Sequence, residues 1–190
     1  MLIWLNSAVA APRRFIFLDR DGVLNENRPD YVKNIREYRF YPDALRALAL
    51  LNEHDIAVIL ISNQSGINRG LINWNDFLEM HDGMLSGVEE SGGKILAAFY
   101  CPHRPDENCR CRKPSPEMIQ AASRFFGINP RETAFIGDTE TDIEAARRAG
   151  CKGIRLCRNG GAQGADTPKS AEPEYFNLLD AVLDLYRGDI

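Results

Sequence analysis

Short apolar runs alternate along this chain with stretches in which apolar residues recur every three to four positions. The apolar runs are continuous and bounded by polar or glycine-containing segments, which is the pattern of strands buried on both faces of a parallel sheet. The stretches between them have the periodicity of amphipathic helices. We therefore predict strands over residues 15–18, 56–61, 95–100 and 133–137, and a fifth over residues 152–156 (KGIRL), where the apolar run is interrupted.

The same pattern predicts five helices, each of which follows one of these strands. Pro42 suits the first position of the first helix, and residues 139–142 (TETD) resemble a capping box that starts the fourth. Gly127 and Gly150 would end the third and fourth helices, because glycine readily adopts the left-handed conformation found there. Apolar positions indicate the first, second, third and fifth helices. In that order they are Leu45, Leu48 and Ala49; Phe77, Met80, Met84, Leu85 and Val88; Met118, Ile119, Ala122, Phe125 and Phe126; and Tyr175, Leu178, Leu179, Val182 and Leu183.

This alternation predicts the fold class. Repeated strand–helix units favour an α/β fold, a Rossmann-like, doubly wound parallel sheet with helices on both faces and right-handed crossovers. The chain has 190 residues, which suits one domain, and we expect residues 1–190 to form it with a core at about 13–187. In such folds ligands bind beyond the carboxyl ends of the strands.

Composition narrows the possible classes of function. Hydrophobic residues make up 44% of the chain and charged residues 26%, as in ordinary globular proteins. The formal net charge of −4 disfavours a nucleic-acid partner, which usually requires a positive surplus. No apolar run approaches the roughly 20 residues of a membrane span. No basic residue precedes the apolar stretch in residues 1–11, so we expect no secretory leader, no membrane partner and a cytoplasmic protein.

Polar residues follow three of the predicted strands. Asp19 and Asp21 follow the first strand two positions apart, so their carboxylates are expected on one side and Arg20 on the other. A polar turn beginning at Ser62 follows the second strand, and Asp138 follows the fourth. Carboxylates brought together need a cation or a shared proton, and an oxygen-rich site of this kind suits Mg²⁺. For each aspartate taken alone, the alternative is a cap on the turn or helix that follows.

A proline-rich loop at residues 101–111 carries a second chemical signal. It contains Cys101, His103, Cys109 and Cys111, and three thiolates with one imidazole match the tetrahedral requirement of a closed, structural Zn²⁺ site. The chain has five cysteines, an odd number, and three of them lie in this loop. Such clustering is typical of a metal site in a reducing compartment rather than of a disulfide framework.

Four motifs resemble, in order, those of the haloacid-dehalogenase-like phosphohydrolases. They are residues 17–24 (FLDRDGVL), residues 62–64 (SNQ), Lys113 and residues 137–142 (GDTETD). The resemblance covers about residues 15–157, and four ordered motifs make a chance match improbable. It implies the fold of that superfamily, and helices, a strand and the cysteine loop fill the chain between the motifs, which leaves no room for a separate cap domain.

The resemblance implies a Mg²⁺-dependent phosphomonoesterase. Asp19 would attack phosphorus and form an aspartyl-phosphate. Asp21 would act as general acid and then as general base, which requires surroundings that raise its carboxyl pKa. Ser62 and Lys113 would hold the phosphoryl oxygens. The implied Mg²⁺ ligands are Asp19, the backbone carbonyl of Asp21 and Asp138, with Asp142 placed next to this ligand set rather than in it.

The loop at residues 101–111 and the residues after it resemble the capless zinc-loop subgroup of that superfamily. This subgroup includes heptose bisphosphate phosphatases and histidinol-phosphate phosphatases, and residues 63–70 and 112–118 are more similar to the heptose enzymes. Ser65 and Arg69 would not suit the cationic amine of histidinol phosphate. The implied partner of a monomeric enzyme is a small sugar phosphate, held by Asn27, Arg28, Tyr31, Asn63, Gln64, Ser65, Arg69, Arg112 and Thr139, with Arg112 as the clamp on its second phosphate.

The implied reaction is removal of the 7-phosphate of a D-glycero-D-manno-heptose 1,7-bisphosphate, on the route to nucleotide-activated heptose, and either anomer remains open. One alternative is a histidinol-phosphate phosphatase. A second is a polynucleotide-end phosphatase, although the chain has no Lys/Arg-rich stripe with interleaved aromatic residues. A third is a binding protein that kept the zinc loop and lost the chemistry, but Asp19, Asp21, Lys113 and Asp138 are all present.

Overall fold

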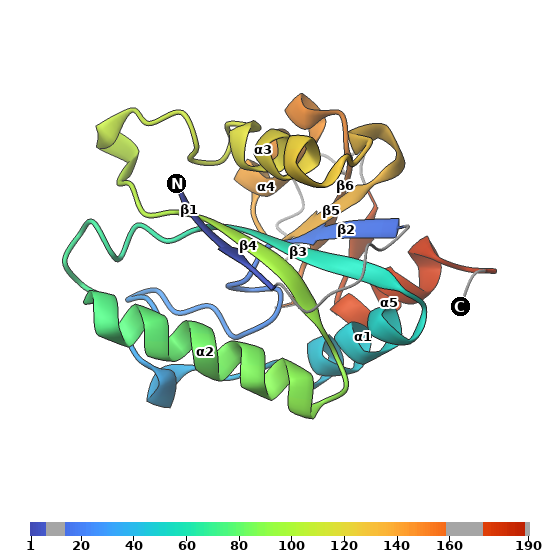
Figure 1. The fold of residues 1–190 in the computed structure, drawn as a ribbon, viewed down its shortest axis with the longest axis horizontal. Coiled ribbons are helices and arrows are strands. Elements are labelled where there is room, and N and C mark those ends of the chain that lie inside the picture. Colours follow the sequence, from blue (N-terminus) through green and yellow to red (C-terminus); the bar gives the residue numbers. More distant parts are fainter. Residues whose placement is uncertain (7–13, 159–172, 189–190) are drawn as a thin grey trace, which may run out of the picture.

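A computed structural model describes residues 1–6, 14–158 and 173–188; residues 7–13, which include part of the N-terminal stretch considered above, lie outside these ranges. Seven strands of the described ranges form one sheet in the order β1-β4-β3-β2-β5-β6-β7 (Figure 1). Only β1 is antiparallel to its neighbour, so the predicted parallel α/β sheet is confirmed. The strands are β1 (Leu2–Leu5), β2 (Arg14–Leu18), β3 (Ile56–Asn63), β4 (Ile95–Cys101), β5 (Ala134–Gly137), β6 (Lys152–Leu156) and β7 (Glu174–Tyr175).

Helices cover both faces of the sheet, as predicted (Figure 1). On one face lie α1 (Pro42–Glu53), α2 (Trp74–Glu90) and α5 (Leu178–Leu185), and on the other lie α3 (Glu117–Phe126) and α4 (Glu140–Ala149). Three short 3-10 helices are η1 (Ile35–Glu37), η2 (Pro105–Glu107) and η3 (Pro130–Glu132). No helix within the described ranges combines the length and apolar character needed to cross a bilayer.

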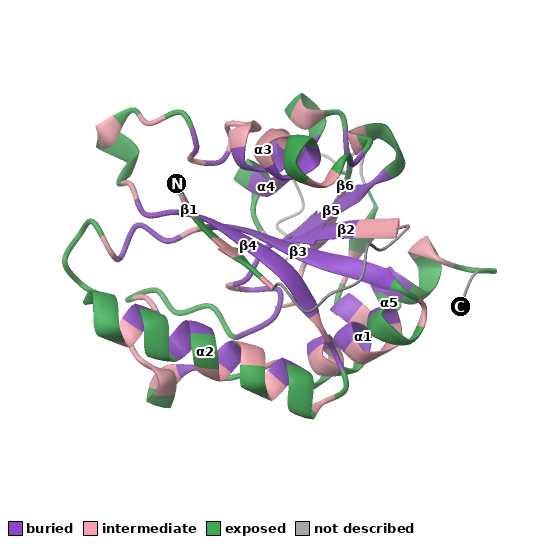
Figure 2. Cartoon of the chain, in the orientation of Figure 1, coloured by how far each residue is buried: buried purple, intermediate pink, exposed green. Residues whose placement is uncertain are grey.

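The central strands separate two apolar cores. Successive side chains of a strand point to opposite faces, so Val58 and Leu60 of β3 pack under α1 and α2, whereas Ile59 and Ile61 pack under α3 and α4. All seven residues of β4 are buried as well (Figure 2). Burial on both faces explains why these strands have continuous apolar sequences rather than alternating ones.

Two strand assignments made from the sequence are wrong. β3 does not end at Ile61: Ser62 and Asn63 continue it and pair with Tyr100 and Cys101 of β4, so Ser62 is a strand residue and not part of a turn. Tyr175 pairs with Leu156 in the two-residue strand β7 and does not belong to the last helix. In both cases the backbone pairing depends on a neighbouring strand, which local periodicity does not report.

In three helices the buried residues differ in part from those that the apolar pattern indicates. The buried residues of α1 are Ala44, Ala47, Leu48 and Leu51, with Leu45 and Ala49 only half-buried. Alanine contributes little to an apolar pattern, yet its small side chain lets a helix approach the sheet closely. Phe125 of α3 and Leu183 of α5, both expected in the core, are 61% and 44% exposed.

The N-terminal strand β1 was not predicted. Residues 2–5 (LIWL) pair antiparallel with β4 at the edge of the sheet, from Leu2 opposite Tyr100 to Leu5 opposite Ala97. Such a short segment lacks the periodicity that distinguishes a strand from an extension. Among the described strands, the antiparallel pairing of β1 with β4 is the one exception to the expected all-parallel sheet.

The topology brings three strand ends together. β2 is central, with β3 on one side and β5 on the other, so the order of connection reverses at β2. Ligands of doubly wound sheets bind at such a switch point, beyond the carboxyl ends of the strands. Asp19 follows β2, Ser62 lies near the end of β3 and Asp138 follows β5, so all three reach this edge.

Candidate active site

A cavity of about 200 Å³ lies beyond the carboxyl ends of β2, β3 and β5. Most of the residues predicted for the site line it, and Arg20, Val32, Ile72 and Thr141 line it in addition. Ser65 and Arg69 do not: Ser65 is buried and Arg69 is exposed on the surface. The predicted residues that line it are Asp19, Asp21, Asn27, Arg28, Tyr31, Ser62, Asn63, Gln64, Arg112, Lys113, Asp138, Thr139 and Asp142.

Asp19 lies at the base of this cavity in a network of donors. Its Oδ1 accepts a hydrogen bond from the Arg20 backbone N–H at 2.7 Å and lies 3.0 Å from Lys113 Nζ, while the Ser62 hydroxyl also hydrogen-bonds to the carboxylate. Burial raises the pKa of Asp19 to about 6, against the opposing effect of the Lys113 ammonium. The result is a desolvated carboxylate with fixed orientation, as a nucleophile requires.

Lys113 connects the nucleophile to the aspartates around it. Its ammonium, only 3% exposed, donates to the Ile61 carbonyl at 2.8 Å and forms ion pairs with Asp19 and Asp142. Burial lowers the pKa of this amine, but the two carboxylates outweigh it and raise the pKa above its usual value. Lys113 is therefore charged, and it neutralises a cluster that would otherwise repel itself.

Asp19, Asp138 and Asp142 bring three carboxylates close enough to hold one metal ion. Burial, followed by the neighbouring Asp19 and Asp142, raises the pKa of Asp138 to about 7. Its Oδ1 is buried without a hydrogen-bond partner among the described residues. An unpartnered carboxylate oxygen beside two further carboxylates fits a hard cation such as Mg²⁺.

Asp142 is nevertheless engaged in other contacts. It is fully buried, its Oδ2 accepts hydrogen bonds from Thr139 N at 3.0 Å and Thr139 Oγ1 at 2.6 Å, and its Oδ1 pairs with Lys113. The predicted capping box at the start of α4 is thus present. Both carboxylate oxygens of Asp142 are thus engaged by protein groups, and Asp142 orients Lys113.

Gly22 allows the loop after Asp21 to approach Asp138. Its φ of +80° is one that residues with a side chain rarely adopt, and a Cβ here would collide with the Asp138 carboxylate. Only glycine therefore fits between the two aspartate-bearing loops.

The structure contradicts two expectations about Asp21. Arg20 does not point away: its guanidinium is buried and forms a bidentate ion pair with the Asp21 carboxylate, at 2.8 Å to each oxygen. Asn25 and Gln64 donate further hydrogen bonds to it, at 2.9 and 2.7 Å. Burial alone would raise the pKa of Asp21, but Arg20 and these donors lower it instead of raising it as expected.

The segment that includes Asn27, Arg28 and Tyr31 forms one wall of the cavity. Tyr31 has a φ of +67°, and its hydroxyl lies 3.3 Å from the Ser65 hydroxyl. Ser65 therefore contacts Tyr31 of this wall but does not line the cavity itself. Arg28, which pairs with Asp30, places one positive charge at this side of the cavity.

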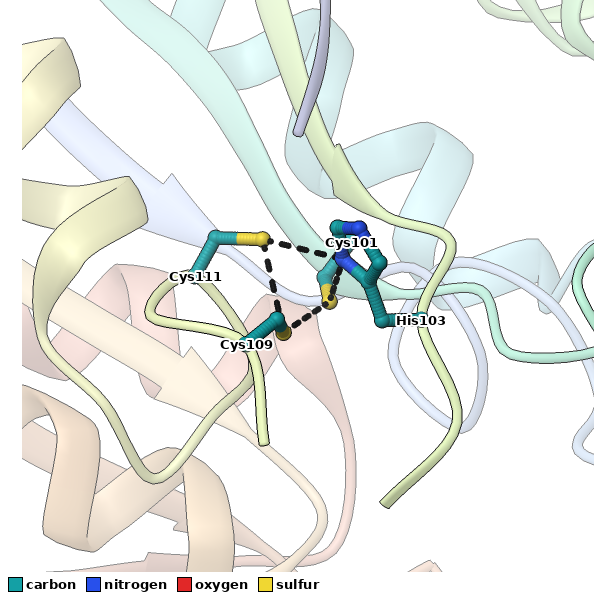
Figure 3. A group of neighbouring side chains, drawn as sticks. All are labelled: Cys101, His103, Cys109 and Cys111. Atoms are coloured by element: carbon teal, nitrogen blue, oxygen red, sulfur yellow. Dashed lines mark hydrogen bonds between the residues drawn. The ribbon is translucent and has the colours of Figure 1, made fainter. Parts of the chain in front are cut away.

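The side chains of Cys101, His103, Cys109 and Cys111 converge on one point (Figure 3). The sulfur–sulfur distances are 3.6 Å from Cys101 to Cys109 and 3.8 Å from Cys109 to Cys111, and His103 Nδ1 lies 3.5 and 3.4 Å from the sulfurs of Cys101 and Cys111. A tetrahedron with metal–sulfur bonds of about 2.3 Å has sulfur–sulfur edges of about 3.8 Å, whereas a disulfide would need about 2.05 Å. The distances fit a tetrahedral metal ion and exclude a disulfide.

The Cys/His loop also supports the cavity. Arg112 follows Cys111 directly and its guanidinium donates to the His103 carbonyl at 3.2 Å. The backbone of the next residue, Lys113, exchanges two hydrogen bonds with the Asn63 side chain at 3.1 and 3.2 Å. A change in the loop would therefore reach both cationic residues of this wall.

Arg20 and Asn25 are the contributors that sequence reasoning missed. An arginine between two aspartates looks like a surface residue, and an asparagine four positions after Asp21 carries no motif. One signal in the sequence could have indicated Arg20. Two neighbouring carboxylates repel each other and require positively charged partners, and Arg20 is the nearest cation in the sequence.

Comparison with known proteins gives a consistent result. The HAD-hydrolase-like family model matches residues 110–185. The D-glycero-beta-D-manno-heptose-1,7-bisphosphate 7-phosphatase of Pseudomonas aeruginosa is 35% identical over 170 residues, which cover 90% of this chain and 96% of that protein. The D-glycero-alpha-D-manno-heptose-1,7-bisphosphate 7-phosphatase of Photorhabdus laumondii is 34% identical, over 76% of this chain and 82% of its own.

A solved structure shows the same arrangement of elements. The D,D-heptose 1,7-bisphosphate phosphatase from B. bronchiseptica, complexed with magnesium and phosphate, matches with a TM-score of 0.84 and 34% identity. The match covers 92% of this chain and 99% of that one. Most of the chain, and not the strand-end motifs alone, is thus shared with these proteins.

Proposed function

Because this chain belongs to the heptose-1,7-bisphosphate 7-phosphatase family of the HAD-like hydrolases, we propose that it removes the 7-phosphate of a D-glycero-D-manno-heptose 1,7-bisphosphate. The observation that carries this proposal is the Asp19 carboxylate between Lys113, Ser62 and the unpartnered oxygen of Asp138. The product would then be consumed on the route to nucleotide-activated heptose.

In the first step, Asp19 attacks phosphorus. A bond forms between an Asp19 carboxylate oxygen and phosphorus while the bond from phosphorus to the C7 oxygen breaks. The departing alkoxide takes a proton, for which Asp21 is the candidate donor at the cavity wall. Lys113 and Ser62 stabilise the charge on the phosphoryl oxygens because both are already oriented beside Asp19.

In the second step, water attacks the aspartyl-phosphate. Asp21 accepts a proton from the water, the bond between phosphorus and Asp19 breaks, and inorganic phosphate leaves. The lowered pKa of Asp21 keeps its carboxylate ionised beside Arg20 and so able to accept a proton, although it also makes the carboxylate a weaker base. To act as the acid of the first step, Asp21 must instead carry a proton, which requires that its contacts with Arg20 loosen.

Asp19, Asp138 and the backbone carbonyl of Asp21 are the residues we propose to hold Mg²⁺. The ion would supply positive charge to the phosphoryl group as it is transferred. Asp142 contributes by orienting Lys113 and by capping α4.

Two arginines favour a substrate with a second phosphate. Arg28 and Arg112 both line the cavity. A guanidinium binds phosphate in a bidentate manner, so either could hold the phosphate at C1. The cationic amine of histidinol phosphate would instead meet two positive charges here, which disfavours that alternative.

We expect the chain to prefer a heptose 1,7-bisphosphate over other phosphate esters. The assay measures phosphate release from the α and β anomers, from histidinol phosphate and from a 3′-phosphorylated oligonucleotide, each with and without Mg²⁺. The expected kcat/KM for one anomer exceeds the values for the other classes at least about a hundredfold, or about 2.7 kcal/mol. A preference for histidinol phosphate would overturn the substrate, and absence of any Mg²⁺-dependent release would overturn the enzyme.

We further propose that the cysteine loop holds a structural Zn²⁺ ion. All four ligand positions of the tetrahedron are filled by Cys101, His103, Cys109 and Cys111, which leaves none for substrate. Although burial acts against it, hydrogen bonding from the Arg112 backbone lowers the pKa of the Cys109 thiol, whereas burial raises the pKa of the Cys101 thiol. Zinc would therefore displace the Cys101 proton when it binds.

Replacing Cys109 with serine is expected to remove the metal and lower stability. The loop has little core of its own, so loss of the metal releases it together with Arg112 and Lys113. We expect zinc content to fall from about one ion per chain to less than about 0.2, with a lower Tm. The matched control is Cys157→Ser, which lies outside the cluster and should keep the metal. Equal zinc content in Cys109→Ser and wild type would contradict the site.

Three further expectations complete the proposal. We propose that residues 1–190 act as one domain, as a monomer, and in the cytoplasm. A free-thiol metal cluster is suited to a reducing compartment. Light scattering after size exclusion should give the monomer mass of 21.4 kDa; twice that mass would contradict the monomer.

A further inference from the structure

Arg158 lies outside the cavity and holds the loop that follows Asp21. It comes two residues after β6, and its side chain is 10% exposed. Its Nε donates to the Gly22 carbonyl at 3.0 Å and its Nη2 to the Val23 carbonyl at 2.6 Å. The remaining nitrogen, Nη1, pairs with Asp43 at 2.8 Å. This guanidinium thus uses all three of its nitrogens.

The loop is fixed from both sides by these contacts. Gly22 presses against the Asp138 carboxylate on one side, where no Cβ would fit, and its carbonyl is held by Arg158. The peptide before it, which contains the Asp21 carbonyl, is held through a hydrogen bond from Gly22 N to the Asn25 carbonyl at 2.8 Å. The orientation of the Asp21 carbonyl therefore depends on both anchors.

The same guanidinium reaches the substrate wall. It stacks on the Tyr41 ring, with Cζ 3.6 Å from the ring centroid. The Tyr41 hydroxyl hydrogen-bonds to the backbone of Asn27, which lines the cavity. Asp43, the partner of Arg158, also accepts a hydrogen bond from Leu178 N at the start of α5. Arg158 therefore joins the loop after Asp21, the segment before α1 and the start of α5.

We propose that Arg158 is a positioning residue for phosphoryl transfer, which sets the Asp21 backbone carbonyl against Asp138 so that the two can bind one Mg²⁺ ion. This inference rests on the proposed Mg²⁺-dependent phosphatase function. Only arginine has a planar fork that can serve two successive carbonyls and a carboxylate at once, while it stacks on an aromatic ring. A lysine at this position could replace the charge and one or two of the hydrogen bonds.

Arg158→Met tests the proposal, with Arg158→Lys as the conservative variant. Calorimetry with Mg²⁺ alone measures metal affinity, and hydrolysis of p-nitrophenyl phosphate and of the heptose bisphosphate measures kcat and KM. We expect Arg158→Met to raise the Kd for Mg²⁺ about tenfold and to lower kcat about thirtyfold, with KM at saturating Mg²⁺ changed less than about threefold. Arg158→Lys should recover part of both losses.

The matched control is Arg155→Met, which removes an arginine of β6 that pairs with Glu140 at the surface. It should leave Kd and kcat within about twofold of wild type. If Arg158 only stabilises the fold, Arg158→Met lowers Tm while Kd and kcat stay at the wild-type values, and that result overturns the proposal. An equal effect of Arg155→Met overturns it too.

Three further outcomes also distinguish the role of Arg158 from the proposed function. If Arg158→Met does not fold, Arg158→Lys decides: a loss of more than about twofold in both Kd and kcat supports the proposal, and wild-type values of both overturn it. If the wild-type protein hydrolyses p-nitrophenyl phosphate but no heptose bisphosphate, the proposed substrate fails while the role of Arg158 is still tested. If the wild-type protein binds no Mg²⁺, both the metal site and this role fail.

Discussion

Asp19→Asn is expected to abolish turnover, with kcat lowered by at least about 10⁴-fold. An amide nitrogen or oxygen cannot replace the carboxylate as the attacking group, so no aspartyl-phosphate forms. The change is nearly isosteric and keeps an oxygen for the donors at Arg20 N and Lys113. The measurement is phosphate release from the heptose bisphosphate at saturating Mg²⁺.

The fold should survive this substitution. The pKa of Asp19 is raised to about 6 by burial, so above that pH the ionised carboxylate opposes folding, and asparagine removes this cost. Without added Mg²⁺, the Tm of Asp19→Asn at pH 8 should therefore be no lower than that of wild type. Asp82→Asn, an exposed aspartate on α2, is the control and should change neither value. Retention of more than about 1% of kcat would show that Asp19 is not the nucleophile.

Much of the fold was accessible from the sequence because the sheet is buried on both faces. β2, β3, β4 and β5 each carry a continuous apolar run, β6 (KGIRL) buries only Ile154 and Leu156, and the helices between them keep their periodicity. β1 and β7 were not found, since strands of four and two residues exist only through pairing with β4 and β6. Whether a short edge segment forms a strand depends on its tertiary contacts, and the local sequence pattern carries no information about those contacts.

The cavity was predictable where a motif residue lies at a strand end, as Asp19, Ser62 and Asp138 do. Lys113 also lines it, but reaches it from the segment that follows the Cys/His loop. Arg20 was misplaced because the alternation of side chains holds within a strand, and β2 ends at Leu18, before the two aspartates. Beyond that point the backbone turns, and Arg20 reaches Asp21 instead of the opposite face.

The supporting contacts were less accessible than the site itself. Arg158 lies 136 residues from its partner Gly22, and Lys113 lies 52 residues from Ile61. A motif indicates which residues belong to the site. Partners that lie far away in the sequence can be identified only from the folded structure, in which the strand ends lie together. The same argument explains why Ser65 and Arg69, which follow β3 in sequence, could be mistaken for cavity residues.

Lys113→Met is expected to lower both activity and stability. The substitution removes the cation between Asp19 and Asp142 and leaves two buried carboxylates without their partner. Breaking a buried ion pair from one side typically costs about 3–5 kcal/mol, which corresponds to a fall in Tm of about 6–20 °C for a protein of this size. Loss of the charge beside the phosphoryl group should lower kcat at least about 10³-fold.

The stability loss should depend on pH in a defined direction. In wild type the pKa values of Asp19 and Asp138 are raised to about 6 and about 7 with Lys113 present, and without its ammonium they rise further. Ionised carboxylates with raised pKa values oppose folding, so the deficit of Lys113→Met is largest above those pKa values and shrinks as the pH falls and the carboxylates take up protons. Thermal melts at pH 8 and pH 5.5, without added Mg²⁺, measure this difference.

Lys152→Met, an exposed lysine at the start of β6, is the matched control and should lose neither Tm nor kcat. If the deficit of Lys113→Met is the same at both pH values, the lost contact is packing rather than charge, and the electrostatic role of Lys113 is wrong. If kcat falls while Tm at pH 8 stays unchanged, the carboxylates do not depend on Lys113 for folding, and its contribution is confined to the transferred phosphoryl group. One ammonium that serves both the fold and the reaction is supported only if Lys113→Met lowers both kcat and Tm and if the loss in Tm shrinks at low pH.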